Sequence, residues 1–401
     1  MKGVQQPAAV PTASLGSKSP LLLHVFASFG YGGVPIRMSR IINHLGARYR
    51  HCIVALDSCF DSRSRIAAGI EVDYREVEIT KRNPARAVLQ ARSSIGALRP
   101  DLVMTYNWGA VEWAMAASLL RGARQIHCES GFGVEEARGQ IARRVLFRRL
   151  ALRRIERLIV PSRTLVEIAR DTWRIEASKI AHIPNGVAVD RFAEAPDRQA
   201  CESLGLSSRP GALLVGTAVP LRPEKNVARL LRAFSRLTAA HDARLAIFGD
   251  GAEREALSRL AERLGIAKRV LFIGHVESLE GVLGALDLFV LSSDTEQMPN
   301  SLIQAMAAGL PVAATDVGDI AVMLPESNRS YLAPAEGDEA LAEAMGSLLA
   351  DDSLRRSLGQ ENRAWVRRHY GEALMLERYE AVLQGQPLPT SVTPCSGAKE
   401  S

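Results

Sequence analysis

The chain has 401 residues, of which 47% are hydrophobic and 23% charged, and its formal net charge is +6. This is the composition of a globular protein, and no segment approaches the roughly 20 consecutive apolar residues of a membrane-spanning helix. We therefore expect no integral membrane protein, and the length favours two domains, each with its own core.

The two ends of the chain differ in composition from the rest. Residues 1–19 and 385–401 are rich in small and polar residues, which predicts a disordered lead-in and a disordered tail. The first stretch lacks the apolar core of about 7 to 15 residues that a signal peptide needs. The five cysteines form no C-x-x-C pair, which is typical of a reducing cytoplasm.

The charge is distributed unevenly along the chain. Up to Asp190 there are 28 Lys and Arg against 16 Asp and Glu, and after it there are 22 against 28. A basic first half can meet phosphate-bearing lipids or other polyanions. Its cations are mostly Arg and lie without interleaved aromatic residues, so we expect no nucleic-acid partner.

The first half alternates apolar runs with helical patterns. Leu21 to Ala27 predicts a strand, the turn Gly30-Tyr31-Gly32-Gly33 follows, and Ile36 to Leu45 predicts a helix. The glycine spacing is not G-x-G-x-x-G, so a plain tight turn explains it as well as a dinucleotide site does. The alternation predicts parallel strands with crossover helices. It continues through His51 to Leu56, Ala85 to Leu98, Leu102 to Thr105, Ala110 to Leu120 and Gln125 to Cys128.

Two loops at predicted strand ends carry polar groups. One is Thr105 to Gly109 and the other is His127 to Gly133, both at the carboxyl edge where open sheets bind ligands. His127 or Glu129 could polarise a hydroxyl or take its proton. The alternative is that His127 is a hydrogen-bonded strand residue and Glu129 an acid at a helix entry.

The segment Gly139 to Arg157 predicts the most charged helix of the chain. Apolar residues recur on it at helical spacing, and arginines cover much of the remaining circumference. Such a helix can rest on an anionic leaflet, or it can be the solvated face of a helix packed on the core.

The second half repeats the alternation after a turn at Pro184-Asn185-Gly186 and a polar segment from Asp190 to Pro210. The predicted strands are Leu213 to Thr217, Arg244 to Phe248, Val270 to Ile273, Leu288 to Leu291 and Val312 to Ala314. The predicted helices are Val227 to Ala239, Glu253 to Leu264, Leu279 to Ala285 and Ser301 to Ala308. Two Rossmann-like halves are therefore expected to face each other.

Polar and glycine-rich turns follow the strands of this second half. Arg222 and Lys225 lie between a strand and a helix, where two cations beside helix N–H groups suit a diphosphate. Further turns that allow close approach are Gly249-Asp250-Gly251 and Gly274-His275-Val276. In Ser292 to Pro311 the helix N–H groups point to the carboxyl edge, an arrangement that binds anions, and Glu296 and Gln304 could face one ligand there. An ordinary strand-turn-helix capped by Asn300 is the alternative.

Several of these segments, in this order, resemble the retaining nucleotide-sugar glycosyltransferases of family 4, which have the GT-B fold. They are GGVPIRMSRIINHL, VPSRTLVEI, IPNGVAVDRF, LRPEKNVARLLRAF, FGDGAEREAL, VLFIGHV and EQMPNSLIQAMAAGLPVAATDVGD, and the likeness spans about residues 20 to 380. The resemblance implies that the C-terminal half binds the donor, the N-terminal half binds the acceptor, and both close over a cleft. No D-x-D occurs, in keeping with the metal-independent chemistry of that family.

The resemblance also implies roles for particular residues. Lys225 matches the lysine that holds the donor diphosphate, and Glu296 matches the first glutamate of E-x7-E, near the donor sugar. Met298, Pro299, Asn300 and Ser301 occupy the loop and helix start that meet the sugar and phosphates. Gly32 and Gly33 match the glycine turn near the diphosphate.

Three positions depart from the family pattern. The second glutamate, which binds the ribose, is Gln304, whose amide bonds a hydroxyl more weakly than a carboxylate does. The arginine expected before Lys225 is Pro220, so Arg222 would have to supply the second cation. The histidine of the acceptor strand corresponds either to His127 or to the position of Ser130.

We therefore expect an α/β GT-B protein with an acceptor-binding domain at 20–190, a linker at 191–210 and a donor-binding domain at 211–370. A helix at 371–384 is expected to return to the first domain. The predicted activity is transfer of a sugar from a UDP- or GDP-type donor to a glycan or lipid-linked acceptor, without cofactor or metal. The expected place is the cytoplasm or the inner face of the membrane, through residues 139–157. A non-catalytic nucleotide-sugar binder, an epimerase and a phosphorylase remain alternatives.

Overall fold

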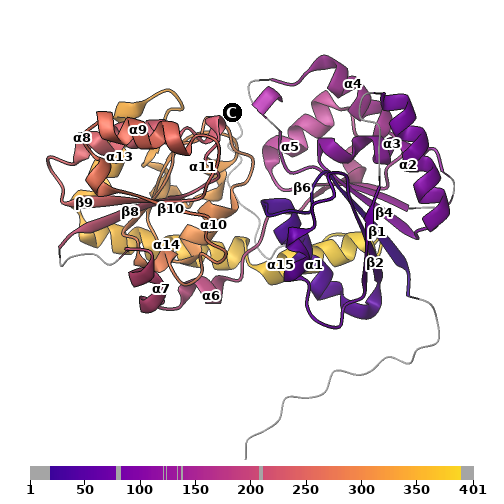
Figure 1. Ribbon diagram of the computed structural model, residues 1–401, viewed down its shortest axis with the longest axis horizontal. Coiled ribbons are helices and arrows are strands. Elements are labelled where there is room, and N and C mark those ends of the chain that lie inside the picture. The colour runs from indigo at the N-terminus through magenta and orange to yellow at the C-terminus, as the bar shows by residue number, and fades with distance from the viewer. Residues whose placement is uncertain are drawn as a thin grey trace, which may run out of the picture.

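The computed structural model of the chain describes residues 19–77, 83–120, 122, 124–132, 134–136, 139–206 and 211–389. Two α/β domains lie side by side, and the chain passes between them after the last strand of the first domain (Figure 1). The predicted lead-in and tail fall almost wholly outside the described residues. Within the described residues, no helix is both long and apolar enough to cross a membrane.

The N-terminal domain is built on a parallel sheet of seven strands in the order β3-β2-β1-β4-β5-β6-β7. The order reverses beside β1, so the carboxyl edge between β1 and β4 is where a sheet of this kind is expected to bind a ligand. The strands are β1 (Leu21–Phe26), β2 (Arg50–Ala55), β3 (Val72–Glu76), β4 (Leu102–Tyr106), β5 (Arg124–Cys128), β6 (Arg157–Val160) and β7 (Ile180–His182).

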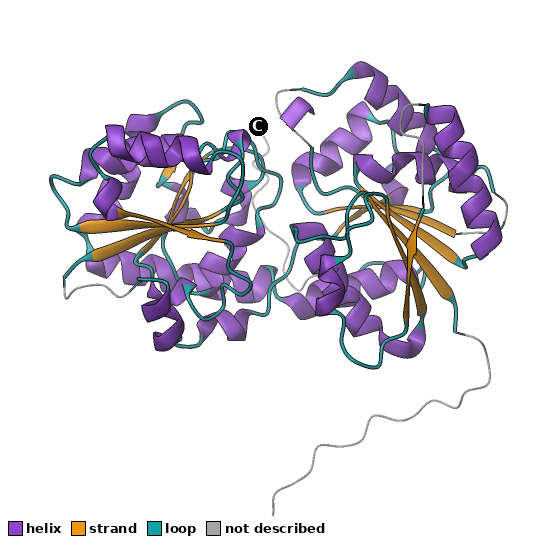
Figure 2. Ribbon diagram, viewed as in Figure 1, coloured by secondary structure: helices purple, strands orange, loops and turns teal. Residues whose placement is uncertain are grey.

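Helices cover both faces of this sheet (Figure 2). The helices of the first domain are α1 (Gly33–Leu45), α2 (Pro84–Leu98), α3 (Val111–Ser118), α4 (Ala142–Ala151) and α5 (Arg163–Glu167). One face packs on α1 and on the last helix of the chain, α15 (Glu372–Leu383), through Met38, Ile41 and Tyr379. The other face packs on α2 to α5, where Trp113 and Trp173 are fully buried.

The C-terminal domain has a six-stranded parallel sheet in the order β10-β9-β8-β11-β12-β13 and one continuous apolar core. Its strands are β8 (Leu213–Ala218), β9 (Ala243–Phe248), β10 (Val270–Gly274), β11 (Leu288–Leu291), β12 (Val312–Thr315) and β13 (Leu332–Ala333). Its helices are α6 (Val189–Ala193), α7 (Arg198–Ser203), α8 (Val227–Leu237), α9 (Arg254–Arg263), α10 (Asn300–Ala307), α11 (Ile320–Met323), α12 (Glu326–Arg329), α13 (Asp338–Ala350) and α14 (Asp352–His369).

Two predicted helices are shorter than expected. The basic segment from Gly139 to Arg157 forms a helix only over Ala142–Ala151, because the chain turns after Leu152, buries Ile155 and enters β6 at Arg157. The segment from Leu279 to Ala285 contains only a short 3₁₀ turn, Leu283–Ala285. Two glycines interrupt it, and one of them, Gly284, packs against Pro196.

The last helix joins the two domains. After α14 the chain crosses back, and α15 packs against α1 of the first domain. Arg40 of α1 pairs with Glu372 at 3.1 Å, and His44 pairs with Glu380 at 3.0 Å. The two domains are therefore held together by this helix as well as by contacts across the cleft.

Candidate functional site

The centre of the site is an ion pair between Lys225 and Glu296. Lys225 Nζ donates to Glu296 Oε1 at 2.7 Å, and Ser293 Oγ donates to the same oxygen at 2.7 Å. Glu296 is buried, with 7% of its surface exposed. The loop after β8 and the loop after β11 thus meet through their side chains, as expected for neighbouring parallel strands that end at one edge.

The local sequence explains where Lys225 lies. Pro223 to Lys225 form a single 3₁₀ turn, and Asn226 then takes a left-handed conformation with φ 41°. The Asn226 side chain accepts a hydrogen bond from the backbone N–H of Arg229, so it caps α8. Lys225 is therefore fixed directly before the helix, with its ammonium directed to Glu296.

A glycine supports the Glu296 loop from behind. Gly318 has φ +57°, and a Cβ at this position would lie 1.8 Å from the carbonyl oxygen of Glu296. The loop after β12 therefore packs against the Glu296 backbone with no room for a side chain. Thr315 adds a hydrogen bond of 2.6 Å to the carbonyl of Ser293.

The start of α10 faces the N-terminal domain. Asn185 Nδ2 donates to the Met298 carbonyl at 2.9 Å, and a Cβ on Gly33 would lie 3.5 Å from Asn300 Nδ2. Pro299 occupies the N-cap position and forms no side-chain cap, so the first N–H groups of α10, including that of Ser301, have no side chain from the cap residue to satisfy them. Gln304 lies one turn further along the helix.

Gln304 and Asn300 line a small cavity of about 30 Å³ between the domains. The N-terminal domain contributes Arg37 and Arg40 of α1 to it. The position of the predicted second glutamate therefore shares this cavity with two arginines.

The remaining predicted donor-side residues are brought to the same edge. A Cβ on Gly249 or Gly251 would lie within 2.0 or 2.4 Å of the carbonyl oxygens of Val219 and Leu221, so these turns pack backbone against backbone. Val276 is half-buried on the core of the second domain. Its neighbour His275 lies 5.5 Å from the Tyr31 ring across the cleft.

Arg222 is exposed and is not among the hydrogen-bonded or ion-paired side chains found in the described residues. Its backbone is ordered, since its carbonyl accepts from Lys225 N at 3.0 Å. The structure thus places Arg222 near Lys225 in the chain, with its side chain exposed.

His127 and Glu129 are buried in the N-terminal domain. Each has about 1% of its surface exposed. His127 Nδ1 shares a hydrogen bond of 2.8 Å with Thr105 Oγ1, and Glu129 lies 3.7 Å from Arg148 Nε. His127 is thus a hydrogen-bonded residue of β5, whereas Glu129 lies directly after that strand beside Arg148 of α4 and not at the start of a helix.

Ser130 occupies the position that turns toward the cleft. Its Oγ accepts from Arg37 Nη2 at 2.7 Å, and its backbone N–H donates to Asn107 Oδ1 at 2.8 Å. His127 lies within β5, which ends at Cys128, whereas Ser130 lies in the loop after that strand. The two candidate positions for the histidine of the acceptor strand thus have different partners, Thr105 for His127 and Arg37 for Ser130.

Five polar residues at the domain contact were not predicted from the sequence. Asp319 accepts from the backbone N–H groups of Arg163 and Thr164 at 2.5 and 3.0 Å, and Ser162 donates to Gln297 at 3.0 Å. The other two are Arg37 and Asn185. Asp319 follows a strand and a glycine, and this was the signal in the sequence that could have identified it. The sequence around its hydrogen-bond partners contains no comparable signal.

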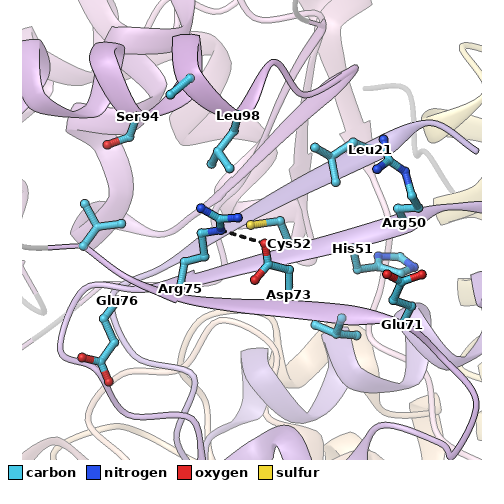
Figure 3. Close-up of a pocket in the computed structure, with 13 residues that line it drawn as sticks. Leu21, Arg50, His51, Cys52, Glu71, Asp73, Arg75, Glu76, Ser94 and Leu98 are labelled. Carbon is cyan, nitrogen blue, oxygen red and sulfur yellow. Dashed lines mark hydrogen bonds and ion pairs between the residues drawn. The ribbon is translucent and has the colours of Figure 1, made fainter. Parts of the chain in front are cut away.

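A larger cavity lies elsewhere, with a volume of about 760 Å³, between α2 and strands β2 and β3 (Figure 3). An ion pair between Asp73 and Arg75, 2.7 Å long, lies on its floor. Burial raises the pKa of Cys52 in its wall to about 11. None of the predicted site residues lines this cavity. Within the described residues, no cluster of His, Cys, Asp and Glu is suited to a metal ion.

Two protein-family models match the chain, one for each domain. The model described as Glycosyl transferase 4-like domain matches residues 32–186, and the one described as Glycosyl transferases group 1 matches residues 209–365. Both matches follow the domain division of the structure. Each contains the predicted residues of its own side of the cleft.

Curated relatives share up to about a third of the aligned residues. N-acetyl-alpha-D-glucosaminyl L-malate synthase of Bacillus anthracis is 30% identical over 161 residues, 40% of this chain and 42% of that protein. 2-Deoxystreptamine N-acetyl-D-glucosaminyltransferase of Streptomyces fradiae is 28% identical over 274 residues, 64% of this chain and 65% of that protein. The matches thus span about half the length of these relatives.

Solved structures match over almost the whole fold. Anabaena Alr3699/HepE in complex with UDP and glucose has a TM-score of 0.77 and 17% identity, and the match covers 91% of this chain and 100% of that one. WaaG, a glycosyltransferase involved in lipopolysaccharide biosynthesis, has a TM-score of 0.71 and 17% identity, with the same coverage. The fold is therefore GT-B, and with both domains matched the chain belongs to the GT4-type group 1 glycosyltransferases.

Proposed function

We propose that this chain moves a sugar from a nucleoside diphosphate to an acceptor hydroxyl and retains the anomeric configuration. The observation that carries the proposal is the pair of Lys225 with the buried Glu296 beside the start of α10, at the edge that faces the other domain. A lysine and free helix N–H groups together match the charge of a departing diphosphate.

The reaction is an exchange of two bonds at the anomeric carbon. The bond to the donor phosphate oxygen breaks, and the bond to the acceptor oxygen forms on the same face of the sugar. The acceptor proton passes to the departing phosphate oxygen, so no protein base is required. Lys225 and the N–H groups of α10 stabilise the charge that develops on the diphosphate, which is electrostatic catalysis in a closed cleft.

We further propose that this charge stabilisation needs no metal ion, because Lys225 and the N–H groups of α10 supply positive charge from the chain itself. The donor type proposed is UDP or GDP. Support comes from relatives and neighbours whose names refer to such compounds: HepE is described in complex with UDP-glucose, and a mannosyltransferase of Mycolicibacterium smegmatis is described as GDP-mannose-dependent.

A binding and product experiment tests this proposal. Purified protein is screened by thermal shift against UDP-, GDP- and ADP-sugars, where a ligand at about 100 times its dissociation constant adds roughly 2.7 kcal/mol of stability. The nucleotide sugar that binds is then incubated with the protein and acceptors in the presence of EDTA. The anomeric configuration of the product is determined from its anomeric proton by NMR. Binding without any turnover would instead indicate a non-catalytic nucleotide-sugar binder.

We propose a lipid-linked or envelope glycan as acceptor, with the protein resting on an anionic membrane surface. The feature that supports this is the outer face of α4, where Leu146 and Leu150 are 58% and 53% exposed. Exposed arginines flank them, among them Arg143 and Arg153. Apolar side chains flanked by cations are suited to the interface of an anionic bilayer.

Vesicle flotation tests the membrane proposal. Wild-type protein should float with vesicles that contain anionic lipid at low salt, and the double variant Leu146→Glu, Leu150→Glu should not. Val322→Glu in the second domain, where the side chain is also exposed, is the matched control. Equal flotation of the double variant and the wild type would refute this docking face.

A further inference from the structure

One buried arginine differs from the others in its partners. The described residues contain four buried arginines, and three of them lie within 4 Å of a carboxylate: Arg148, Arg229 and Arg355. The fourth, Arg37, is 6% exposed and is absent from the ion pairs found among the described residues. Burying a charge without a counter-ion costs free energy, so we expect such an arginine to bind a ligand or to serve another function.

The contacts of Arg37 are with neutral groups. Its Nη2 donates to Ser130 Oγ at 2.7 Å, and its Nη1 donates to Asn185 Oδ1. The third nitrogen, Nε, is buried and has no hydrogen-bond partner. These bonds fix the plane of the guanidinium and leave its charge uncompensated.

The guanidinium lies where two helices begin. Gly33 and Arg37 are four residues apart on α1 and so share one face, and Gly33 approaches Asn300 at the start of α10. Neither helix has a side-chain cap or an acidic residue in its first turn. Arg37 also lines the small cavity with Asn300 and Gln304. Two uncapped helix starts and an unpaired cation therefore converge on one spot.

We propose that Arg37 supplies the second cation for the donor diphosphate, from across the cleft. This rests on the proposed function. In this chain Pro220 stands where a cation is expected, Arg222 is exposed, and Lys225 already shares its charge with Glu296. Arg37 can take the missing place because Asn185, its partner, is itself bonded to the Met298 carbonyl directly before α10.

This assignment makes full charge stabilisation depend on domain closure. Lys225 and α10 belong to the donor domain, whereas Arg37 and Gly33 belong to the acceptor domain. A diphosphate bound to an open cleft meets one cation, and the closed cleft provides two. Closure and leaving-group stabilisation are thereby coupled through one side chain.

The test is calorimetric titration of UDP and GDP, with the matching monophosphates as comparison. Arg37→Gln should bind the diphosphate about 10- to 100-fold more weakly than wild type, with a smaller loss for the monophosphate. Arg37→Lys should recover part of the affinity. The matched control is Arg48→Gln, which removes the same charge from a half-exposed arginine that pairs with Glu380.

A second variant keeps Arg37 in place and supplies the missing anion within the chain. Ser130→Asp puts a carboxylate against Nη2, which should lower diphosphate affinity even if Arg37→Gln does not fold. If Arg37→Gln or Ser130→Asp bound the diphosphate as tightly as the wild type while Lys225→Ala bound it weakly, the proposed role of Arg37 would be wrong. The proposed donor would not be affected by that result. No binding of UDP or GDP by the wild type would overturn both this role and the proposed donor.

Discussion

At the scale of single residues, the site depends on Glu296, whose side chain and backbone are both held by neighbouring groups. Glu296 Oε1 accepts from Lys225 and Ser293, while its carbonyl lies against Gly318. A buried carboxylate with two donors is costly to displace. The position of Glu296 therefore depends on the loop after β12 as well as on its own hydrogen bonds.

This arrangement gives a prediction for Gly318→Ala. A Cβ there would lie 1.8 Å from the Glu296 carbonyl oxygen and would also strain a residue at φ +57°. We expect a loss of stability of about 1 to 3 kcal/mol in urea unfolding, together with weaker binding of the nucleoside diphosphate.

Gly96→Ala is the matched control for this substitution. Gly96 lies within α2, and nothing lies within 4 Å of a Cβ at that position. In a helix this change should raise stability by up to about 1 kcal/mol. If Gly318→Ala had the stability and the nucleoside diphosphate affinity of the wild type, the loop after β12 would have to adjust without moving Glu296.

Sequence reasoning located some of these residues and could not locate others. Lys225 and Glu296 follow their strands directly, so the local pattern and the family resemblance place them at one edge. Whether His127 or Ser130 faces the cleft depends on which strand face packs on α1, and that is decided by the sheet and not by the segment. Arg37 and Asp319 act through partners more than 90 residues away.

At the scale of elements, a polar network crosses the centre of the first sheet. His24 of β1 shares hydrogen bonds with Tyr106 of β4 at 2.8 Å and with His51 of β2 at 3.1 Å. Burial, and secondarily the charge on His51, lowers the pKa of His24 well below 6.5. Burial lowers the pKa of His51 to about 4.

These shifts predict how stability depends on pH. In the unfolded chain a histidine binds its proton near pH 6.5, whereas folded His51 stays neutral down to about pH 4. The unfolded state therefore takes up more protons between these values, so stability is complete above pH 6.5 and falls as the pH drops toward 4. Urea unfolding should show a loss of about 1 to 3 kcal/mol from this group.

The variant His51→Gln should flatten this part of the pH profile. His275→Gln, at an exposed position outside the sheet, serves as the control. The same decline in stability in both variants would mean that groups other than His51 cause it.

The regular elements were predicted well where their patterns are long, and less well where they are short. Strand β3 reads VDYRE, with only one face half-buried, and β13 has two residues, so neither shows the apolar run that marked the other strands. Helix α4 ends early because Ile155 and Leu158 are needed in the core beside β6. Apolar periodicity alone does not show where a chain leaves a helix to enter a sheet.

At the scale of the whole molecule, the two domains meet through a buried carboxylate. Asp319 of the second domain accepts from two backbone N–H groups at the start of α5 and from Thr164 Oγ1 at 2.6 Å. Its loop includes Gly318, which packs against Glu296. The contact between the domains is therefore continuous with the support of the donor loop.

We predict that Asp319→Ala loosens this contact. Loss of hydrogen bonds to one charged group should cost about 1 to 3 kcal/mol in stability. Small-angle scattering should show a larger radius of gyration, and donor affinity should fall, because closure becomes less favourable. Asp316→Ala, an exposed residue of the same loop, is the control and should leave all three unchanged. Unchanged scattering in Asp319→Ala would contradict a role in closure.

The central claim is that the cleft binds a nucleoside diphosphate sugar through Lys225 and releases the diphosphate on transfer. The most direct measurement is the rate at which nucleoside diphosphate is released from the nucleotide sugar that binds. This rate is compared for the wild type, Lys225→Ala and Arg222→Ala. Lys225→Ala should lower this rate by about 100- to 1,000-fold, and the exposed Arg222 should matter far less. Release by Lys225→Ala at the wild-type rate would contradict the account.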